Sequence, residues 1–307
     1  MQKALRTITY NYHSPLNPAQ LTVAQGEEFL AETELCTGGW LARAEDCWTP
    51  DKTCALNPTV VVAIDGAKPG DMLAVDVLRI EPDALGYTGF DTKLNPLAER
   101  IYPTDWGVYA KTVRLDGEFA LWSDAVKLPL SPMIGTLGTA PAGEALSNAR
   151  AGAHGGNMDV QEIAEGCTVY LPVEVDGALL HIGDVHALQG DGEINCSGGI
   201  ECRSVVKLRA RAVRRPEAYG CVRVENADCL MTVASDKSLE TSFYLGVSQL
   251  LSWMEGEYGI PKKEGYLLLG QVMQARNTQF VNPTWSYVCK VPKKFLRRAQ
   301  ISDTISS

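Results

Sequence analysis

Runs of β-branched or alternating apolar residues, bounded by glycine, proline or aspartate, recur through the first 220 residues of the chain. These runs are short and regularly interrupted, and their period of two is typical of strands. The pattern predicts strands at residues 59–64, 72–80, 168–175, 178–182 and 205–213. The segment 83–106 is rich in glycine, proline and polar residues and predicts a long loop, and a further loop is expected to begin at Gly183.

The C-terminal part of the chain has a different periodicity. Apolar residues recur there at steps of three and four, which predicts a helix containing Leu239, Phe243, Val247, Leu250, Met254 and Tyr258. Ser235 or Asp236 is expected to cap this helix and Gly259 to end it. A second helix at 261–274 and a strand at 285–291 follow. We therefore predict a mainly β fold, a β-sandwich or barrel at residues 1–220 that contains the catalytic residues, with a smaller α+β section at 221–307 packed on it.

The composition narrows the class of function. The formal net charge of −9 opposes binding to nucleic acid or to an anionic membrane surface. No apolar run resembles a signal peptide or approaches the length of a membrane span. The nine cysteines include no Cys-x-x-Cys pair, so we expect free thiols in a reducing cytoplasm.

The stretch 151–200 concentrates acidic and imidazole groups. Its fifty residues hold eight acidic side chains and three of the four histidines, with no lysine or arginine. Glycines between the polar residues let the backbone turn tightly and approach a ligand closely. Carboxylates and imidazoles without a neighbouring cationic side chain indicate that a bound metal ion supplies the missing positive charge. We expect a divalent ion, with zinc ahead of calcium.

Three residues are the predicted metal ligands. Asp184 and His186 are two positions apart, so on a strand they project to the same side, and Asp159 comes from an earlier glycine-rich loop. Three protein ligands leave one position open, which is typical of catalytic zinc rather than structural zinc. Glu193 and Glu201 lie downstream, and either could be a further ligand or a proton-transfer group.

Other residues are candidates for contact with a substrate. Asn157 offers an amide that could hold an oxyanion or only stabilise a turn. His154 could ligate the metal, orient the substrate or anchor its loop, and Gln189 and Trp40 are also predicted to bind the substrate. His181 is expected to be a structural sheet residue.

The order and spacing of several motifs resemble the acetamidase/formamidase family. They are His154-Gly-Gly-Asn-Met-Asp159, Tyr170-Leu-Pro-Val173, Gly177-Ala-Leu-Leu180, Gly183-Asp-Val-His-Ala-Leu-Gln-Gly-Asp-Gly-Glu193, Ile200-Glu201 and Val281-Asn-Pro283. The resemblance covers most of the chain and implies a cytoplasmic, metal-dependent amide hydrolase that is commonly oligomeric. This chain departs from the family at Leu35 and Trp40, where relatives usually carry aspartate and glutamine.

These observations together predict hydrolysis of a small neutral carboxamide. A metal ion held by Asp159, Asp184 and His186 would activate water, and Glu201, or else Glu193, would protonate the departing amine. Two alternatives stay open. Cys36 or Cys196 could be a thiolate nucleophile, or the acidic loops could bind calcium or a small ligand in a protein without catalytic activity.

Overall fold

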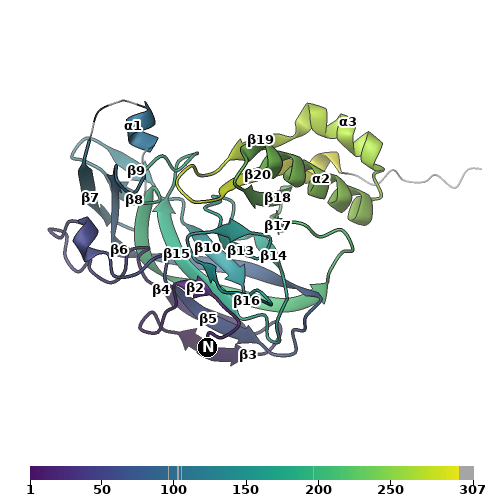
Figure 1. Cartoon of the computed structure of the whole chain (residues 1–307), viewed down its shortest axis with the longest axis horizontal. Helices are drawn as coiled ribbons and strands as arrows, with labels where there is room; N and C mark the ends of the chain where they lie inside the picture. Colours follow the sequence, from purple (N-terminus) through teal and green to yellow (C-terminus); the bar gives the residue numbers. More distant parts are fainter. Residues whose placement is uncertain (96, 102–103, 105, 196, 297–307) are drawn as a thin grey trace, which may run out of the picture.

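The computed structural model describes residues 1–95, 97–101, 104, 106–195 and 197–296 (Figure 1). Its strands are β1 (Gln2–Ala4), β2 (Tyr12–His13), β3 (Leu21–Val23), β4 (Glu28–Thr33), β5 (Thr59–Ile64), β6 (Asp71–Asp91), β7 (Val108–Leu115), β8 (Phe119–Leu121), β9 (Lys127–Pro129), β10 (Met133–Thr139), β11 (Leu146–Ser147), β12 (Ala151–Gly152), β13 (Gly155–Asn157), β14 (Thr168–Pro172), β15 (Leu180–Leu188), β16 (Ile200–Arg214), β17 (Val222–Glu225), β18 (Cys229–Asp236), β19 (Gln274–Asn277) and β20 (Trp285–Pro292). The α-helices are α1 (Leu97–Ile101), α2 (Leu239–Tyr258) and α3 (Lys262–Val272), and single 3-10 turns lie at Pro50–Lys52 and Lys293–Phe295.

Most strands belong to one large curled sheet with β15 near its middle. The first half of β15 lies between β5 and β10, and its second half lies between β10 and β16. β16 leaves β15 after three residue pairs and continues along β4 and β6. Because neighbours change along each long strand, the sheet curls around a core of valine, isoleucine and leucine side chains. The mainly β prediction is confirmed.

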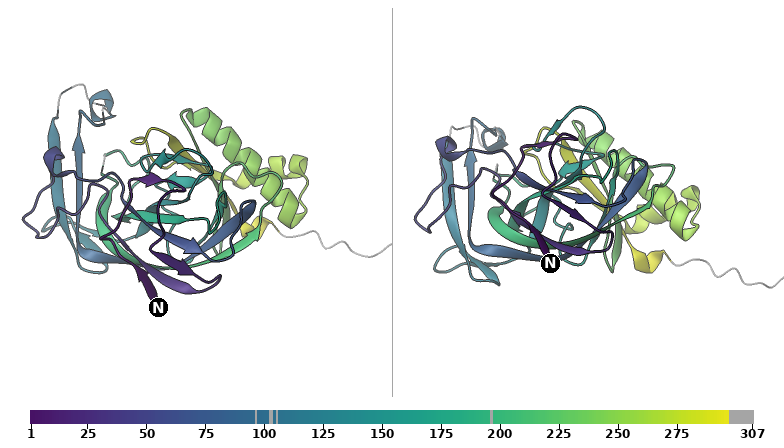
Figure 2. Two further views of the ribbon diagram at one scale, coloured as in Figure 1. Left: turned by 60° about the horizontal axis from the view of Figure 1, so that its bottom comes forward. Right: turned by 90° about the horizontal axis from the view of Figure 1, so that it is seen from below.

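The helices form a smaller layer at one side of the molecule. Figures 1 and 2 show α2 and α3 together on this side, while β7, β8 and β9 extend at the opposite side. The inner face of α2 buries Leu250, Trp253 and Met254 against β18 and β20. The helix itself is as predicted, except that its N-cap is Ser238, whose side chain accepts from the Thr241 amide. Gly259 ends it in the left-handed conformation, with φ of 67°.

Two loop predictions were wrong. Residues 83–91 continue β6, because the bent strand accommodates Pro82 and two glycines while pairing with β16 and β7. The segment after Gly183 continues β15 to Leu188, so Asp184 and His186 belong to a strand. The sheet also crosses residue 220, since β17 pairs with β14, and the division into two regions stays a prediction. Within the described part of the chain, none of the helices has the length and apolar character needed to span a membrane.

Candidate metal centre and active site

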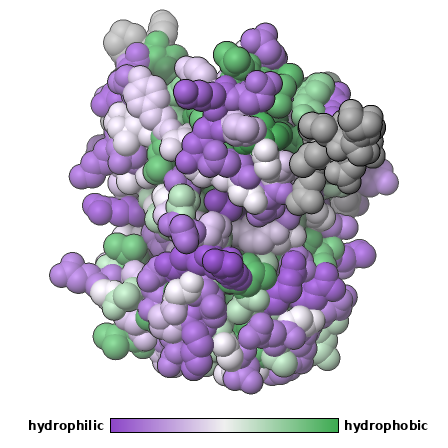
Figure 3. Space-filling view, turned by 90° about the vertical axis from the view of Figure 1, so that its right-hand side faces the viewer, coloured by the Kyte–Doolittle hydropathy of each residue, from purple (hydrophilic) through white to green (hydrophobic). Residues whose placement is uncertain are grey.

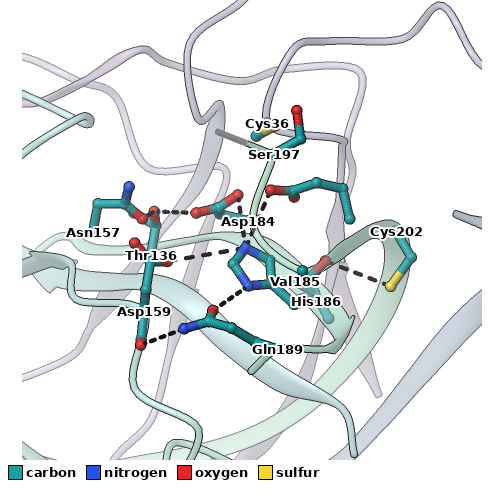
Figure 4. A network of polar contacts seen from close by, with 12 residues as sticks. Cys36, Thr136, Asn157, Asp159, Asp184, Val185, His186, Gln189, Ser197 and Cys202 are labelled. Atoms are coloured by element: carbon teal, nitrogen blue, oxygen red, sulfur yellow. Dashed lines mark hydrogen bonds and ion pairs between the residues drawn. The ribbon is translucent and has the colours of Figure 1, made fainter. Parts of the chain in front are cut away.

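Two adjacent strands and the loop after a third bring the candidate ligands together inside the sheet. β15 carries Asp184 and His186, β16 places Glu201 opposite His186 in the ladder, and Asp159 follows β13. The His186 Nε2 atom lies 3.5 Å from Asp184 Oδ1, 3.3 Å from Glu201 Oε1 and 3.9 Å from Asp159 Oδ1. All four side chains are buried, and Figure 4 shows Asp159 and Asp184 pointing toward the imidazole ring of His186.

The His186 ring is oriented by Gln189. The Gln189 amide nitrogen donates to the carbonyl oxygens of Asp159 and Thr278, so its oxygen faces His186 Nδ1 at 2.7 Å. A neutral His186 therefore carries its proton on Nδ1, and the lone pair of Nε2 points at the carboxylates. This is the arrangement of a metal-ligating histidine with a fixed tautomer. Gln189, predicted to bind the substrate, lies behind the ring in this structure.

The backbone around the site is unusual. Asp159, Asp184 and Glu193 have positive φ angles of 50°, 57° and 41°, which non-glycine residues seldom adopt. At Asp184 the left-handed residue lies within β15, between the pairs that Gly183 and Val185 make with β10. Strain of this kind concentrates at functional sites, where it aims a side chain that a regular strand would direct elsewhere.

A network of amides and hydroxyls holds the carboxylates. Thr136 on β10 donates to Asp184 Oδ2 at 3.1 Å, and Asn282 donates to Asp159 Oδ2 at 2.5 Å. With its nitrogen turned toward the acids, Asn157 donates to Asp184 Oδ2 at 2.7 Å and Asp159 Oδ1 at 3.2 Å, while its oxygen accepts from Asn57. Asn157 thus spaces the two aspartates here, and its predicted contact with an oxyanion stays a prediction.

The pKa shifts of the clustered side chains are consistent with a bound cation. Burial, and then the charge of Asp184, raise the pKa of Asp159 to about 6, and burial raises the pKa of Glu201 to about 8. Burial and the charge of Asp159 raise the pKa of Glu193 well above its usual value. Burial lowers the pKa of His186, but the charges of Glu201 and Asp184 outweigh it and raise that pKa. Buried carboxylates this close together cannot all be ionised unless positive charge compensates them.

The donor atoms fit a metal ion. Within the described residues, Asp184 Oδ1, His186 Nε2, Glu193 Oε2 and Glu201 Oε2 are buried without a hydrogen-bond partner. Ligand atoms about 2.1 Å from a tetrahedral ion lie roughly 3.4 Å apart, and the Nε2 distances of 3.3 to 3.9 Å agree with that spacing. Two groups with no residue in common can supply such donors, namely Asp159, His186 and Glu193, and Cys36, Asp184 and Glu201.

Two glycines make room for the cluster. A Cβ atom on Gly135 would lie 2.6 Å from Asp159 Oδ1 and 2.7 Å from Asp184 Oδ2. A Cβ on Gly198 would lie 2.3 Å from His186 Cε1 and 2.5 Å from Glu201 Oε1. The sequence predicted no role at the site for either glycine, because their importance comes from contacts across strands.

Gly135→Ala is expected to disturb the candidate metal centre. The added methyl group must displace two aspartate side chains and also meets the backbone oxygen of Asp184 at 2.8 Å, so β10 and β15 must shift and we expect metal affinity to fall by about tenfold to a hundredfold. Titration of the metal-free protein with zinc measures this affinity. Gly143→Ala is the matched control, because a Cβ there meets nothing within 4 Å. Equal affinity of both variants would show that the cluster tolerates the displacement.

A cavity of about 280 Å³ opens onto the cluster. Asn157, Asp184, Glu193 and Glu201 form one wall. The lining also includes the apolar residues Trp48, Leu56, Leu94, Val281 and Pro283, and polar residues such as Asn57, Asn95 and Asn282. A few convergent polar groups facing apolar walls are typical of sites for small organic molecules.

Comparisons with known proteins identify the family of the chain. The family model described as Acetamidase/Formamidase matches residues 2–152 and 142–226. The chain belongs to the acetamidase/formamidase family. An acetamidase from Mycolicibacterium smegmatis is 28% identical over 274 residues, spanning 69% of this chain and 68% of that protein.

Solved structures place the whole fold in the same family. The crystal structure of an acetamidase from Bacillus halodurans is 28% identical, with a TM-score of 0.88 over 95% of this chain and 98% of that one. An acetamidase from Yersinia enterocolitica is 27% identical, with a TM-score of 0.86 over 96% of this chain and 91% of that one. These similarities support hydrolysis of small linear amides by this member of the acetamidase/formamidase family.

Two candidate substrate contacts lie away from the cavity wall. Trp40 donates to the Thr37 hydroxyl and packs edge-on against Tyr87, and Trp48 lines the cavity instead. His154 packs against His13, outside the acidic cluster. Their predicted contacts with substrate therefore stay predictions. Sequence reasoning missed Trp48 and Thr136, whereas the motif Val281-Asn-Pro283 was a signal for Asn282.

Proposed function

We propose that this chain hydrolyses the carbon–nitrogen bond of a small linear carboxamide and releases ammonia and a carboxylate, using a divalent metal ion. The convergence of Asp159, Asp184, His186 and Glu201 on one buried point beside the cavity carries this proposal. Bound there, such an ion would polarise the amide carbonyl and lower the pKa of a water molecule to about 7. An unactivated amide needs both effects.

The chain's own residues would position the reactants and move the proton. The cavity admits the amide between its apolar residues and the carboxylates, which orients the carbonyl toward the cluster. Glu201 faces the cavity at the same wall, so its carboxyl oxygen can take a proton from the attacking water and return it to the departing nitrogen. Glu193 is the second candidate for this role. Asn157 keeps the two aspartates apart and Gln189 keeps Nε2 of His186 deprotonated.

The geometry disfavours the cysteine alternative. Cys36 Sγ lies 3.0 Å from the Tyr87 hydroxyl, and burial, followed by the charges of Glu201 and Asp184, raises its pKa well above the usual value. A nucleophilic cysteine needs a lowered pKa and a cationic or basic neighbour. Cys196 lies outside the described residues.

Three finer properties belong to the same proposal. We favour zinc as the ion, because imidazole and carboxylate donors at this spacing suit it. We propose a cytoplasmic enzyme, in keeping with free cysteines throughout the described residues. We also propose a homo-oligomer, because large apolar side chains such as Tyr109 and Ile194 are exposed by 66% and 63%.

Chelator treatment tests the proposed function. EDTA is expected to abolish ammonia release from acetamide and formamide, and one equivalent of zinc should restore it. Cys36→Ser is the companion variant and should retain most activity, since its hydroxyl can replace the thiol contact with Tyr87. Activity that survives EDTA but is lost in Cys36→Ser would favour a thiolate mechanism. If chelation lowers thermal stability and no amide is hydrolysed under any condition, the ion is structural.

A further inference from the structure

A second set of polar groups lies away from the amide cavity, beside the end of α2. Two adjoining cavities of about 420 Å³ and about 260 Å³ share Arg214, Pro216, Arg223, Trp253 and Glu257 as lining residues, and we call them the arginine groove. None of these residues lines the cavity over the metal centre. Figure 3 shows this side of the molecule, on which hydrophilic residues predominate.

Arg223 is a buried charge that makes no ion pair among the described residues, although the charge of Glu257, which also lines the groove, acts on it. Its side chain projects from β17, it is only 4% exposed, and its guanidinium lies over the Trp253 ring at 5.1 Å. Within the described part of the chain, no ion pair or side-chain hydrogen bond joins Arg223, and its Nε atom and the Trp253 Nε1 atom are buried without acceptors. Burial lowers the pKa of Arg223. An unpaired buried guanidinium is costly, so proteins rarely keep one unless an anion binds it.

Further arginines lie around Arg223. Arg211, Arg214 and Arg215 also line the groove, which is unusual in a chain with net charge −9. Arg211 is paired with Asp76, and Arg215 is paired with Glu174.

Two arginines of the groove thus lack an ion pair. Within the described ranges, Arg214 has no ion pair, so it and Arg223 are the groove arginines without one. Glu217 and Glu257 are the acidic residues on the groove wall. With Asp76 and Glu174 counted, four carboxylates match the four groove arginines in number, and Arg223 and Arg214 remain the arginines with which an added anion can pair.

We propose that the arginine groove binds a small organic anion, whose phosphate or carboxylate group pairs with Arg223 and Arg214. Oxygen atoms of the anion would accept hydrogen bonds from the N–H groups of Arg223 that have no acceptor in the protein. The planar guanidinium can bind either a phosphate or a carboxylate in a bidentate contact. The cavity volumes accommodate a molecule larger than the inorganic ion. This site does not depend on the amide hydrolase activity, because the arginine groove and the cavity over the acidic cluster have no lining residue in common.

Thermal unfolding of the full-length protein in matched ionic strength tests the groove. Sodium phosphate, phenyl phosphate and sodium benzoate are compared with sodium chloride. We expect at least one of the three anions to raise Tm by about 2 °C or more over chloride, in a saturable manner. A response to both phosphates indicates phosphate recognition, and a response to benzoate indicates carboxylate recognition. Equal Tm values in all four salts would overturn the proposal.

Arg223→Gln separates an anion site from a structural arginine. If the site binds anions, the variant should lose the anion-dependent rise in Tm and should be at least as stable as the wild type in chloride, because an uncompensated buried charge is gone. If Arg223 only packs against Trp253 and binds no anion, the variant should be less stable than the wild type in chloride and should keep the anion-dependent rise in Tm. That result would contradict the proposal.

Two further variants complete the test. Arg79→Gln, on an exposed arginine paired with Glu81 outside the groove, is the control that should keep the wild-type response. Arg214 is exposed, so the substitution Arg214→Gln should leave folding unaffected. It should weaken anion binding at least threefold if Arg223→Gln does not fold, and unchanged binding would overturn the proposal.

Discussion

Asp184→Asn is expected to lower kcat/KM for amide hydrolysis by about a hundredfold or more and to strip most of the metal from the purified protein. The amide keeps the shape of the carboxylate and can still accept from Thr136. The substitution removes the negative charge that lies 3.5 Å from His186 Nε2. An ion bound by both side chains would need this charge. Elemental analysis and ammonia release measure the two effects separately.

Asp191→Asn is the matched control for this variant. Asp191 belongs to the same acidic stretch, but its side chain is 71% exposed and pairs with Arg276 at the surface. Exposed ion pairs contribute little stability, so metal content and turnover should stay within about twofold of the wild type. The metal-free Asp184→Asn protein should unfold no earlier than the metal-free wild type, since it loses like-charge repulsion at Asp159. Full metal content and full turnover in Asp184→Asn would remove Asp184 from the centre.

Local sequence patterns correctly predicted those strands and helices whose formation depends mainly on local interactions. The run 59–64 is a strand because β-branched residues lie between two turn signals, and α2 follows from one apolar stripe that ends at a glycine. The segment 83–91 was predicted wrongly because proline and glycine usually indicate loops. In β6 they lie in a bent strand, whose pairing with β16 and β7 overrides local preference.

Some residues of the candidate site could be predicted from local sequence patterns and others could not. Asp159, Asp184 and His186 could be chosen from the sequence because unneutralised acids and imidazoles clustered there, and the fold brings them within 4 Å of one point. Gly135 and Thr136 could not be chosen, because they act across the β10 and β15 ladder, which no spacing in the sequence reveals. The roles of polar residues such as Gln189 and Asn157 also could not be predicted, because they depend on hydrogen-bond partners from other strands and loops.

The free energy of unfolding is expected to fall steeply as the pH decreases from 6.5 toward 4, because three buried histidines resist protonation in the folded protein. The His13 ring stacks on His181 at 4.4 Å and meets His154 edge-on at 5.1 Å. Burial lowers the pKa of His154 to about 4. Burial, and then the charge of His154, lower the pKa of His181 to about 4, and burial and the other two histidines lower the pKa of His13 well below its usual value.

Hydrogen bonds fix these histidines in neutral tautomers. His13 Nδ1 donates to the Asn148 side-chain oxygen at 2.7 Å, because the Asn148 amide nitrogen already donates to three oxygens. His181 Nδ1 donates to the Leu179 carbonyl oxygen, and its Nε2 accepts from Asn17 at 3.0 Å. A proton on His181 Nε2 would therefore face another donor inside the sheet.

The direction of the pH effect follows from proton counts. Between pH 6.5 and about 4 the unfolded histidines are protonated and the folded ones are not, so the unfolded state binds more protons and stability rises with pH. The contribution is complete above pH 6.5 and is lost as the pH falls through this window. A shift from 6.5 to about 4 is worth about 3 kcal/mol for one histidine. The raised pKa values of Asp159 and Glu201 act in the opposite direction, since their folded forms hold protons that the unfolded chain releases.

Urea unfolding of the wild type and His181→Gln at pH 7.0, 6.0 and 5.0 isolates the histidine contribution, because the carboxylates of the metal centre are common to both proteins. The variant should lose stability at pH 7.0, where packing is disturbed, and should show a shallower decline toward pH 5.0. Asn17→Ala is the control: it removes a hydrogen bond to His181 but no titrating group, so it should lower stability while leaving the slope nearly as steep. A decline in His181→Gln that runs parallel to the wild type would show that the acid sensitivity originates outside the histidine cluster.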